Sequence, residues 1–234
     1  MHGGVMMDER EDGIAAVIFD MDGLLIDSEP LWCRAQVDVL QSINYAYEAA
    51  DCAQSVGVRI DQAVANWYEQ QPWQGASQAE VTERILERML ALIAEEGQPL
   101  PGALATVDFF EQRGLPLAVG SSSPQHIIAA NINALGLDGR FEVVCSAEDD
   151  RYGKPHPAVY LRTADKLDVD RRRCLVFEDS IPGLLAAKAA EMTCICVPDA
   201  DHVGDKRLGI ADWVLPSLSA FGEGLWQQIA DIWR

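Results

Sequence analysis

Two carboxylates near the start of the chain have the spacing and setting of a metal-assisted phosphoryl site. Asp20 and Asp22 directly follow the apolar run 14–19, whose β-branched residues and flanking glycines predict a buried strand. Alternation along that strand directs both side chains to the same side, and Gly23 allows the chain to turn sharply behind them. Two acids at the carboxyl end of a strand suit a hard cation such as Mg²⁺ together with a phosphoryl group.

Two other interpretations of Asp-x-Asp-Gly compete with this one. The same letters open a calcium-binding EF-hand loop, but that loop needs an oxygen ligand at position 24, a glutamate at position 31 and a preceding helix. Leu24 and Leu31 are apolar and a predicted strand comes first, which argues against calcium. If only Asp-x-Asp-Gly is considered, a solvated turn is the expected interpretation. The later motifs make the phosphoryl site the better interpretation.

A serine-rich turn follows a second predicted strand. The sequence Gly-Ser-Ser-Ser-Pro at 120–124 offers hydroxyls and backbone amides next to the start of a helix, which predicts an anion site. Ser121 and Ser122 are assigned to the phosphate. Ser123, directly before Pro124, is expected only to cap the helix.

Lys154 and the pair Glu178 and Asp179 follow two further apolar runs. Lys154 stands between a glycine and a proline, so we expect its ammonium to be held in place to screen a carboxylate from a phosphate. Acids before a helix often serve only the helix dipole. Joined with Asp20 and Asp22, however, Glu178 and Asp179 supply an all-oxygen Mg²⁺ site.

The elements that must position these residues alternate along most of the chain, which predicts an α/β fold with a doubly wound, Rossmann-like parallel sheet. The later strands are expected at 115–120, 141–145, 174–177, 193–197 and 213–215. Helices are expected at 103–113, 124–136, 157–167, 180–190 and from about 218. Because the carboxyl ends of parallel strands share one edge of the sheet, the motifs are expected to meet there.

The stretch between the first strand and the rest has helical periodicity and no strand signal. Four helices are expected, at 30–43, 49–56, 61–71 and 77–97, the last begun by a capping box of Ser77 and Glu80. Two crossing segments would let such a unit tilt over the carboxylates. We therefore divide the chain into a core of 13–28 and 102–234, a helical cap domain of 29–97 and a hinge linker of 98–101.

Hydrophobic residues make up an ordinary 49% of the 234 residues, but the net charge is −19. Such acidity argues against nucleic acid and anionic membranes as partners, and no apolar run approaches the roughly 20 residues of a membrane span. The first twelve residues show no secretory signal, so a cytoplasmic protein is expected. We also expect a monomer.

The cysteines form no C-x-x-C pair, so small buried core residues are expected rather than structural zinc or disulfides. Two of them stand two positions apart in an apolar run, which would place both thiols on one face of a strand. The six are Cys33, Cys52, Cys145, Cys174, Cys194 and Cys196.

The ordered motifs Asp20-x-Asp22, Ser121, Lys154 and Glu178-Asp179 resemble those of the haloacid dehalogenase superfamily. The helical insertion after the first motif is similar to the C1 cap of that superfamily. The stretches 20–32, 57–61, 67–68, 71–73 and 154–157 look like the subgroup of 2-deoxyglucose-6-phosphate and hexitol phosphatases. Two departures are small: Gly-Ser-Ser-Ser replaces Ala-Ser-Ala-Ser, and a glycine stands at 153 where serine is usual.

The resemblance implies a Mg²⁺-dependent phosphatase, tolerant of Mn²⁺ or Co²⁺, that acts on small phosphorylated sugars or polyols. Asp20 would be the nucleophile that forms an aspartyl-phosphate, and Asp22 the general acid and base. The metal would be held by Asp20, Asp22 through its main-chain carbonyl, Asp179 and Glu178, while the phosphate would contact Ser121, Ser122 and Lys154.

The cap is expected to set the substrate preference. Arg59 is a candidate substrate contact, although a surface arginine is an equal alternative, and Trp67 and Trp73 are expected in the helical core, where one of them could also line the pocket. A sugar-phosphate mutase similar to β-phosphoglucomutase is the alternative function, because it shares the cap and the motifs. A catalytically silent binding protein is the third.

Overall fold

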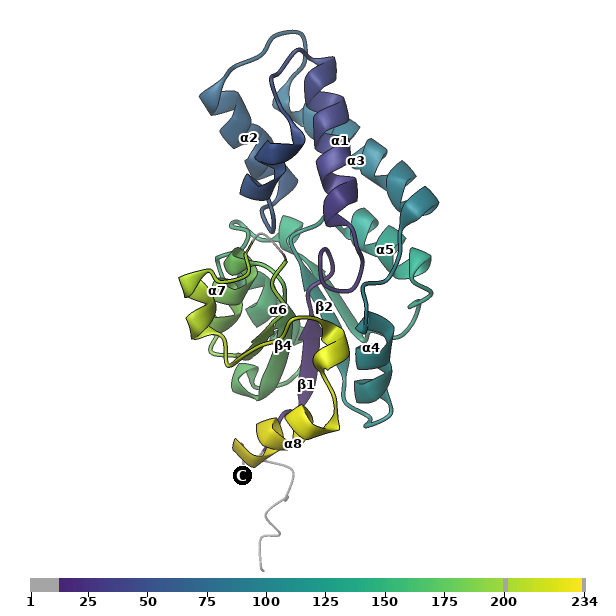
Figure 1. The fold of residues 1–234 in the computed structure, drawn as a ribbon, viewed down its shortest axis with the longest axis vertical. Coiled ribbons are helices and arrows are strands. Elements are labelled where there is room, and N and C mark those ends of the chain that lie inside the picture. Colours follow the sequence, from purple (N-terminus) through teal and green to yellow (C-terminus); the bar gives the residue numbers. More distant parts are fainter. Residues whose placement is uncertain (1–12, 200–201, 233–234) are drawn as a thin grey trace, which may run out of the picture.

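A six-stranded parallel sheet forms the centre of the protein, as the sequence predicts (Figure 1). The computed structural model describes residues 13–199 and 202–232, so the predicted absence of a secretory signal concerns residues outside this range. None of the described helices is long and apolar enough to cross a membrane. In spatial order the strands are β3 (Val143–Ser146), β2 (Leu117–Ser121), β1 (Ala16–Phe19), β4 (Cys174–Glu178), β5 (Thr193–Cys196) and β6 (Trp213–Val214).

Helices cover both faces of this sheet, and β1 supplies side chains to each. Val17 and Phe19 pack on one face and Ala16 and Ile18 on the other, as period-2 alternation requires. The first face is covered by α4 (Ala103–Glu111), α5 (Gln125–Ala134) and α8 (Glu223–Ile232), and the second by α6 (Ala158–Leu167) and α7 (Ile181–Ala189). The last helix begins later than the predicted position near 218, where the chain instead forms a short 3₁₀ helix.

A helical unit stands beyond the carboxyl edge of the sheet (Figure 1). It contains α1 (Glu29–Ser42), α2 (Ile60–Gln70) and α3 (Gln78–Glu96). The predicted capping box is present at α3, where Ser77 Oγ accepts from the Glu80 amide and the Glu80 carboxylate accepts from the Ser77 amide. The expected second helix at 49–56 is present as a shorter 3₁₀ helix, Ala49–Gln54, which ends before Gly57 turns left-handed at φ 73°.

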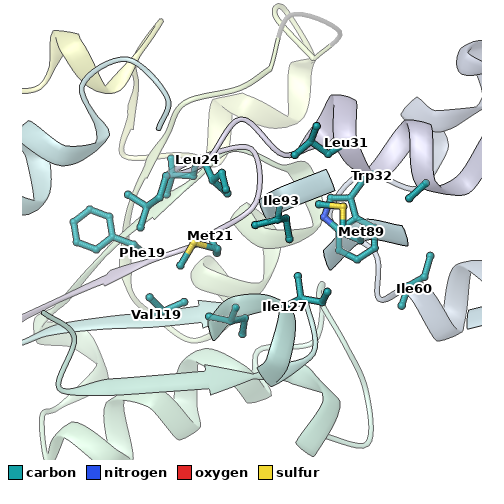
Figure 2. Packing of buried hydrophobic residues seen from close by; sticks show 14 of the residues in the cluster. Phe19, Met21, Leu24, Leu31, Trp32, Ile60, Met89, Ile93, Val119 and Ile127 are labelled. Carbon is teal, nitrogen blue, oxygen red and sulfur yellow. The ribbon is translucent and has the colours of Figure 1, made fainter. Parts of the chain in front are cut away.

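The helical unit and the sheet share one continuous apolar cluster. Figure 2 shows members of this cluster from both parts: Leu31 of α1 and Met89 and Ile93 of α3, together with Met21, which follows β1, and Ile127 of α5. The unit is therefore held against the sheet in this conformation by buried apolar surface as well as by its two connections.

The two connections run side by side. The amide of Asp27 donates to the Gln98 carbonyl at 2.9 Å, and the amide of Leu100 donates to the Leu25 carbonyl at 3.0 Å. The outgoing and returning segments thus form one paired crossing at the position where the sequence predicts the hinge linker 98–101.

A disulfide joins Cys33 of α1 to Cys52 of the 3₁₀ helix, which corrects the expectation that the protein has none. Their Cα atoms lie 5.4 Å apart, because the 3₁₀ helix packs on α1. A sequence separation of 19 carries no signal of such a pair, so only packing reveals it. The other four cysteines are free and buried, as predicted.

Candidate active site

A buried cluster of paired charges lies at the carboxyl edge of the sheet. Asp20, directly after β1, accepts a hydrogen bond from Lys154 Nζ at 2.5 Å, and the same ammonium donates to Glu178 Oε1 of β4 at 2.6 Å. The hydroxyl of Tyr160 in α6 also donates to Glu178 Oε1. Two strands and one helix therefore supply the groups around this loop lysine, which lies between two carboxylates.

Asp20, Glu178 and Asp179 can also hold a metal ion, because one carboxylate oxygen from each lies within 4.8 Å of the others. The Oδ2 of Asp179 is buried and has no hydrogen-bond partner among the described residues. A carboxylate oxygen without a partner is costly inside a protein, and a cation would satisfy it. Gly23 permits this arrangement, since a Cβ there would lie 2.1 Å from that oxygen.

Both oxygens of Glu178 are already used, so Asp179 is the better direct ligand. Oε1 accepts from Lys154 and Tyr160, while Oε2 accepts from the amides of Asp179 and Ser180 and from the Ser180 hydroxyl. In contrast, Asp22 is not part of this acidic cluster, and its carboxylate accepts hydrogen bonds from Ser28, Trp32 and Ser123.

Burial is the main influence on the titration of these acids. Burial raises the pKa of Asp20 to about 8, although Lys154 opposes the shift, and burial followed by Glu178 raises the pKa of Asp179 well above its usual range. Burial alone would lower the pKa of Lys154, but Asp20 and Glu178 raise it. Burial would also raise the pKa of Glu178, yet Lys154 lowers it, so Glu178 is the ionised partner. A divalent cation between Asp20 and Asp179 would supply positive charge at this site.

Asp22 accepts hydrogen bonds from a ring of neutral donors. Its Oδ1 accepts from Ser28 Oγ at 2.8 Å, Trp32 Nε1 at 3.0 Å and Asn131 Nδ2 at 3.2 Å, and its Oδ2 from Ser123 Oγ at 2.6 Å and Ser121 Oγ at 3.5 Å. These donors come from the crossing segment, α1, α5 and the serine turn. These five donors fix the position of the Asp22 carboxylate at the edge of the site.

The serine turn differs from its prediction at one residue. Ser123 does not cap α5: the helix begins at Gln125 after Pro124, with no side-chain cap, and the Ser123 hydroxyl bonds Asp22 instead. Extended backbone at Pro124 separates the serines from the helix, which explains the change of role. Ser121 is buried at the end of β2, and the Ser122 hydroxyl donates to the Gly57 carbonyl of the helical unit.

A cavity of about 550 Å³, solvent at its mouth included, lies between this edge of the sheet and the helical unit. Its lining comprises Asp20, Asp22, Glu29, Trp32, Gln36, Ser55, Gly57, Val58, Ile60, Ala63, Ser121, Ser122, Ser123, Pro124, Lys154 and Ser180.

Three predicted cap residues lie outside this lining. Arg59 forms an ion pair with Asp61, and its Nη1 donates to the carbonyls of Ala147 at 2.9 Å and Asp150 at 2.8 Å. Trp67 and Trp73 are buried in the helical unit, in edge contact with tyrosines, as predicted for its core. The structure thus uses Arg59 to connect the cap to the loop before Lys154.

The lining also contains residues that sequence reasoning did not assign. Glu29, Trp32 and Gln36 come from one face of α1, and burial, followed by the charge of Asp22, raises the pKa of Glu29 to about 8. Their spacing of three and four residues is the available signal, but it equally suits a buried helix face.

The sequence pattern of the haloacid dehalogenase-like hydrolases matches residues 14–191, well over half of the chain. The chain belongs to this family. Hexitol phosphatase B of Escherichia coli (strain K12) is 43% identical to this family member over 207 residues, which cover 88% of this chain and 93% of the relative. This dehalogenase-like hydrolase is therefore an enzyme that acts on phosphoric monoesters.

Solved structures agree with the fold of this haloacid dehalogenase-like hydrolase. CbbY from Rhodobacter sphaeroides in complex with phosphate has a TM-score of 0.84 and 26% identity, with 92% of this chain and 99% of that chain covered. β-Phosphoglucomutase from Clostridium difficile has a TM-score of 0.83, with 94% and 98% covered, but at 20% identity this likeness shows the fold alone.

Proposed function

We propose that the protein is a cytoplasmic, Mg²⁺-dependent phosphatase of monophosphorylated hexitols and small sugars. The expected substrates are 2-deoxyglucose 6-phosphate, sorbitol 6-phosphate and mannitol 1-phosphate. The similarity to hexitol phosphatase B supports the substrate class, and the buried acidic cluster supports a hard divalent cation.

The observation that carries this proposal is the single cation of the cavity. Lys154 is the only basic side chain among the described residues that line it, and its ammonium is bound to Asp20 and Glu178. One phosphate can therefore be neutralised at the sheet edge. A second phosphate, which a mutase must hold on a bisphosphate, would have no further basic side chain to pair with among the described lining residues. This charge distribution favours a monophosphate and a phosphatase.

The phosphate would lie between Asp20, Ser121 and Lys154. A metal bound by Asp20 and Asp179 would neutralise charge on the phosphate oxygens and so allow a carboxylate to approach them. Lys154 orients the Asp20 carboxylate through its 2.5 Å hydrogen bond and remains charged beside the phosphate. The Ser121 hydroxyl, 3.5 Å from Asp22, is close enough to the cavity to donate to a phosphate oxygen instead.

In the first half-reaction, a carboxylate oxygen of Asp20 attacks phosphorus in line with the leaving group. The bond between phosphorus and the ester oxygen breaks, and its electron pair stays on that oxygen. Asp22, in its protonated form, donates a proton to the oxygen, so that a neutral alcohol departs and an aspartyl-phosphate is left.

In the second half-reaction, Asp22 acts as the base. It takes a proton from a water molecule, which attacks the phosphorus of the aspartyl-phosphate and breaks the bond to Asp20. Inorganic phosphate forms, Asp20 returns to a carboxylate and Asp22 is protonated again. The hydroxyl, indole and amide donors around Asp22 would hold its carboxylate in position between the two steps.

The test compares hydrolysis with phosphoryl transfer. The purified protein with Mg²⁺ is incubated with each of the three expected substrates and, separately, with β-glucose 1-phosphate plus a bisphosphate primer. Inorganic phosphate should accumulate in the first reactions, and glucose 6-phosphate should not appear in the second. Accumulation of glucose 6-phosphate without net phosphate release would assign the protein to the mutases, and no turnover of any substrate would favour a silent binding protein.

A further inference from the structure

One face of α1 forms the wall of the cavity opposite the phosphate site. We call Glu29, Trp32 and Gln36 the α1 wall; they are spaced by three and four residues, and all line the cavity. The indole N–H of Trp32 is occupied by Asp22. Because Trp32 contacts Asp22, a leaving group that receives its proton from Asp22 would lie beside this wall.

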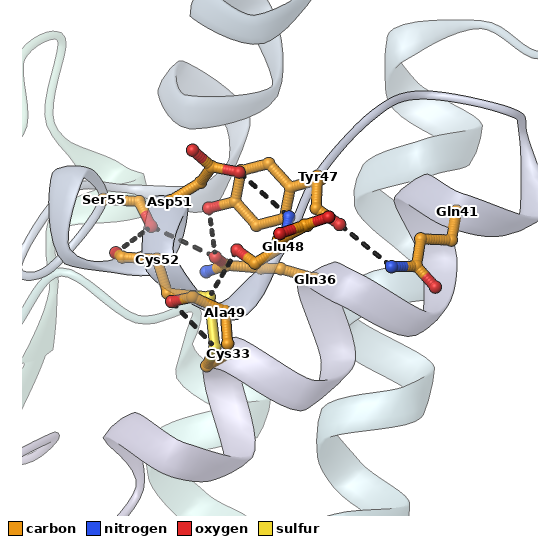
Figure 3. Close-up of a disulfide and its surroundings, with 9 residues drawn as sticks. All are labelled: Cys33, Gln36, Gln41, Tyr47, Glu48, Ala49, Asp51, Cys52 and Ser55. Carbon is orange, nitrogen blue, oxygen red and sulfur yellow. Dashed lines mark hydrogen bonds between the residues drawn. A yellow bond between two sulfur atoms is a disulfide. The ribbon is translucent and has the colours of Figure 1, made fainter.

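The carboxamide of Gln36 is buried, and its orientation is defined. Only 5% of Gln36 is exposed, and its Oε1 accepts from the Tyr47 hydroxyl at 2.9 Å and from Ser55 Oγ at 3.1 Å (Figure 3). Ser55 shares its proton with the Cys52 carbonyl, whereas Gln36 is the one acceptor recorded for Tyr47 among the described residues. With the oxygen directed to Tyr47, the amide nitrogen has no acceptor among the described residues, and it is not fully enclosed, since Asn131 Oδ1 and Asp179 Oδ2 are the buried side-chain atoms left without a partner there.

The surroundings of Gln36 are rigid. The disulfide joins Cys33, three residues before Gln36, to Cys52, three residues before Ser55, and so holds together the two segments that meet at the carboxamide (Figure 3). Tyr47 packs edge-on against Trp67 in the cap core, with ring centroids 5.0 Å apart. A buried donor held in this way can select a partner, because little conformational entropy is lost on binding.

The unpaired amide protons need an acceptor of a particular kind. Glu29 lies on the same wall, and the wall has no basic side chain to pair with an anionic group, while Val58 and Ile60 supply apolar surface to the cavity. A neutral chain that carries hydroxyls on carbon satisfies all three conditions: the hydroxyl oxygen accepts from the amide, and the C–H groups contact the aliphatic side chains.

We propose that Gln36 determines specificity by donating a hydrogen bond from Nε2 to a hydroxyl oxygen of a polyhydroxylated leaving group, with Tyr47 positioning the amide. This inference rests on the proposed phosphatase function and assigns the recognition of the polyol to α1, in addition to the phosphate chemistry at the sheet edge.

The experiment uses two substrates that differ only in hydroxyls. Sorbitol 6-phosphate and n-hexyl phosphate have the same carbon chain length, and the ratio of their kcat/KM values measures recognition of hydroxyl groups. Gln36→Leu should lower this ratio about 10- to 100-fold, because a hydroxyl would then be buried without its donor. The kcat/KM for hexyl phosphate should change by less than about 3-fold, since it makes no such hydrogen bond.

Two further variants separate recognition from structure. Tyr47 does not line the cavity, but its hydroxyl orients the amide of Gln36. Tyr47→Phe removes that hydroxyl and should therefore lower the ratio less than Gln36→Leu does, by about 3- to 10-fold. Gln41→Leu is the matched control: Gln41 is an exposed glutamine of α1 that donates to the Tyr47 carbonyl at 3.0 Å, and its loss should leave the ratio unchanged.

The outcomes distinguish this inference from the proposed function. A wild-type protein that prefers sorbitol 6-phosphate, with an unchanged ratio in Gln36→Leu, would overturn the role of Gln36 and leave the phosphatase intact. A wild-type ratio near one would overturn the polyol substrate class and the inference with it. If thermal melting shows that Gln36→Leu does not fold, the ratio of Tyr47→Phe decides, and an unchanged value there would refute the proposal.

Discussion

The two sides of the cavity use different chemistry. The catalytic floor, which we define as Asp20, Asp22, Ser121, Lys154, Glu178 and Asp179, holds buried charges that pair across strands. The α1 wall has one neutral amide, one indole and one carboxylate, and it is held by a disulfide and by hydroxyl hydrogen bonds. The catalytic floor suits transfer of a phosphoryl group, and the α1 wall suits recognition of the alcohol that leaves.

This difference separates rate from selectivity. Interactions with the phosphate are the same for every monoester, so a change in the floor should affect all substrates alike. Interactions with the leaving group differ between alcohols, so a change in the wall should alter their order. The four predictions below test whether the separation holds.

The largest effect is expected from the nucleophile. Asp20→Asn should lower kcat by at least about 10³-fold for every substrate, because an amide oxygen is a poor nucleophile, while the fold is retained. Steady-state phosphate release and a circular dichroism melt measure the two properties. Asp27→Asn, an exposed acid on the same loop, is the control and should retain activity. Wild-type turnover by Asp20→Asn would contradict the covalent mechanism.

Removal of metal should abolish phosphate release at the catalytic floor and leave the structure of the α1 wall unchanged. EDTA should reduce phosphate release to background and Mg²⁺ should restore it, whereas Ca²⁺ should restore little because of its looser coordination. Mg²⁺ should also raise the melting temperature of the wild type, since saturation at 100 times Kd stabilises by about 2.7 kcal/mol. Asp179→Asn should lose this shift, and full activity in chelator would exclude the carboxylates as metal ligands.

A smaller effect is expected from the connection between the two sides. Arg59→Ala removes two hydrogen bonds to the carbonyls of Ala147 and Asp150, so KM should rise about 10-fold for all substrates together. Arg34→Ala breaks an exposed ion pair within the cap and should change KM less than about 2-fold. A reordered substrate preference in Arg59→Ala would instead show that Arg59 contacts the leaving group.

The smallest effect on turnover is expected from the disulfide. Cys52→Ser should lower the stability of the cap by about 3 kcal/mol through the entropy of the closed loop, as measured by limited proteolysis or a two-step melt. Turnover of hexyl phosphate should change less than about 2-fold, because no residue of the floor is touched. Cys174→Ser, in a buried free cysteine of β4, is the comparison. An equal loss of turnover for all substrates in Cys52→Ser would show that the wall supports the floor.

The floor could be predicted because local sequence defines it. Asp20, Ser121 and Glu178 each end a short apolar strand, and parallel strands bring their carboxyl ends to one edge. The fold class and the family are confirmed on this basis. Gly23 could also be assigned from its neighbours in the sequence, because it follows Asp22 directly and its turn leaves room for Asp179.

The wall could not be predicted in the same way. Gln36 and Trp32 have the helical spacing of an ordinary buried face, and Ser123 has the sequence of an ordinary helix cap. The charge of Arg59 makes it a candidate substrate contact in the sequence. A guanidinium, however, binds the carbonyls and carboxylates that surround it, and the partners of Arg59 lie outside the cavity. The disulfide depends on the packing of the 3₁₀ helix against α1.

The sequence by itself therefore determined the alternation of strands and helices, the placement of two acid pairs and a serine at strand ends, the lysine in the loop between β3 and α6, and the helical insertion. These features rest on backbone periodicity and on short-range turns, which neighbouring residues decide. Tertiary structure decided which donors surround Asp22, which carboxylate oxygen is left without a partner and which helix face lines the cavity. Those outcomes depend on distances between segments far apart in the chain, and a side chain takes its role from the groups that the folded chain brings to it.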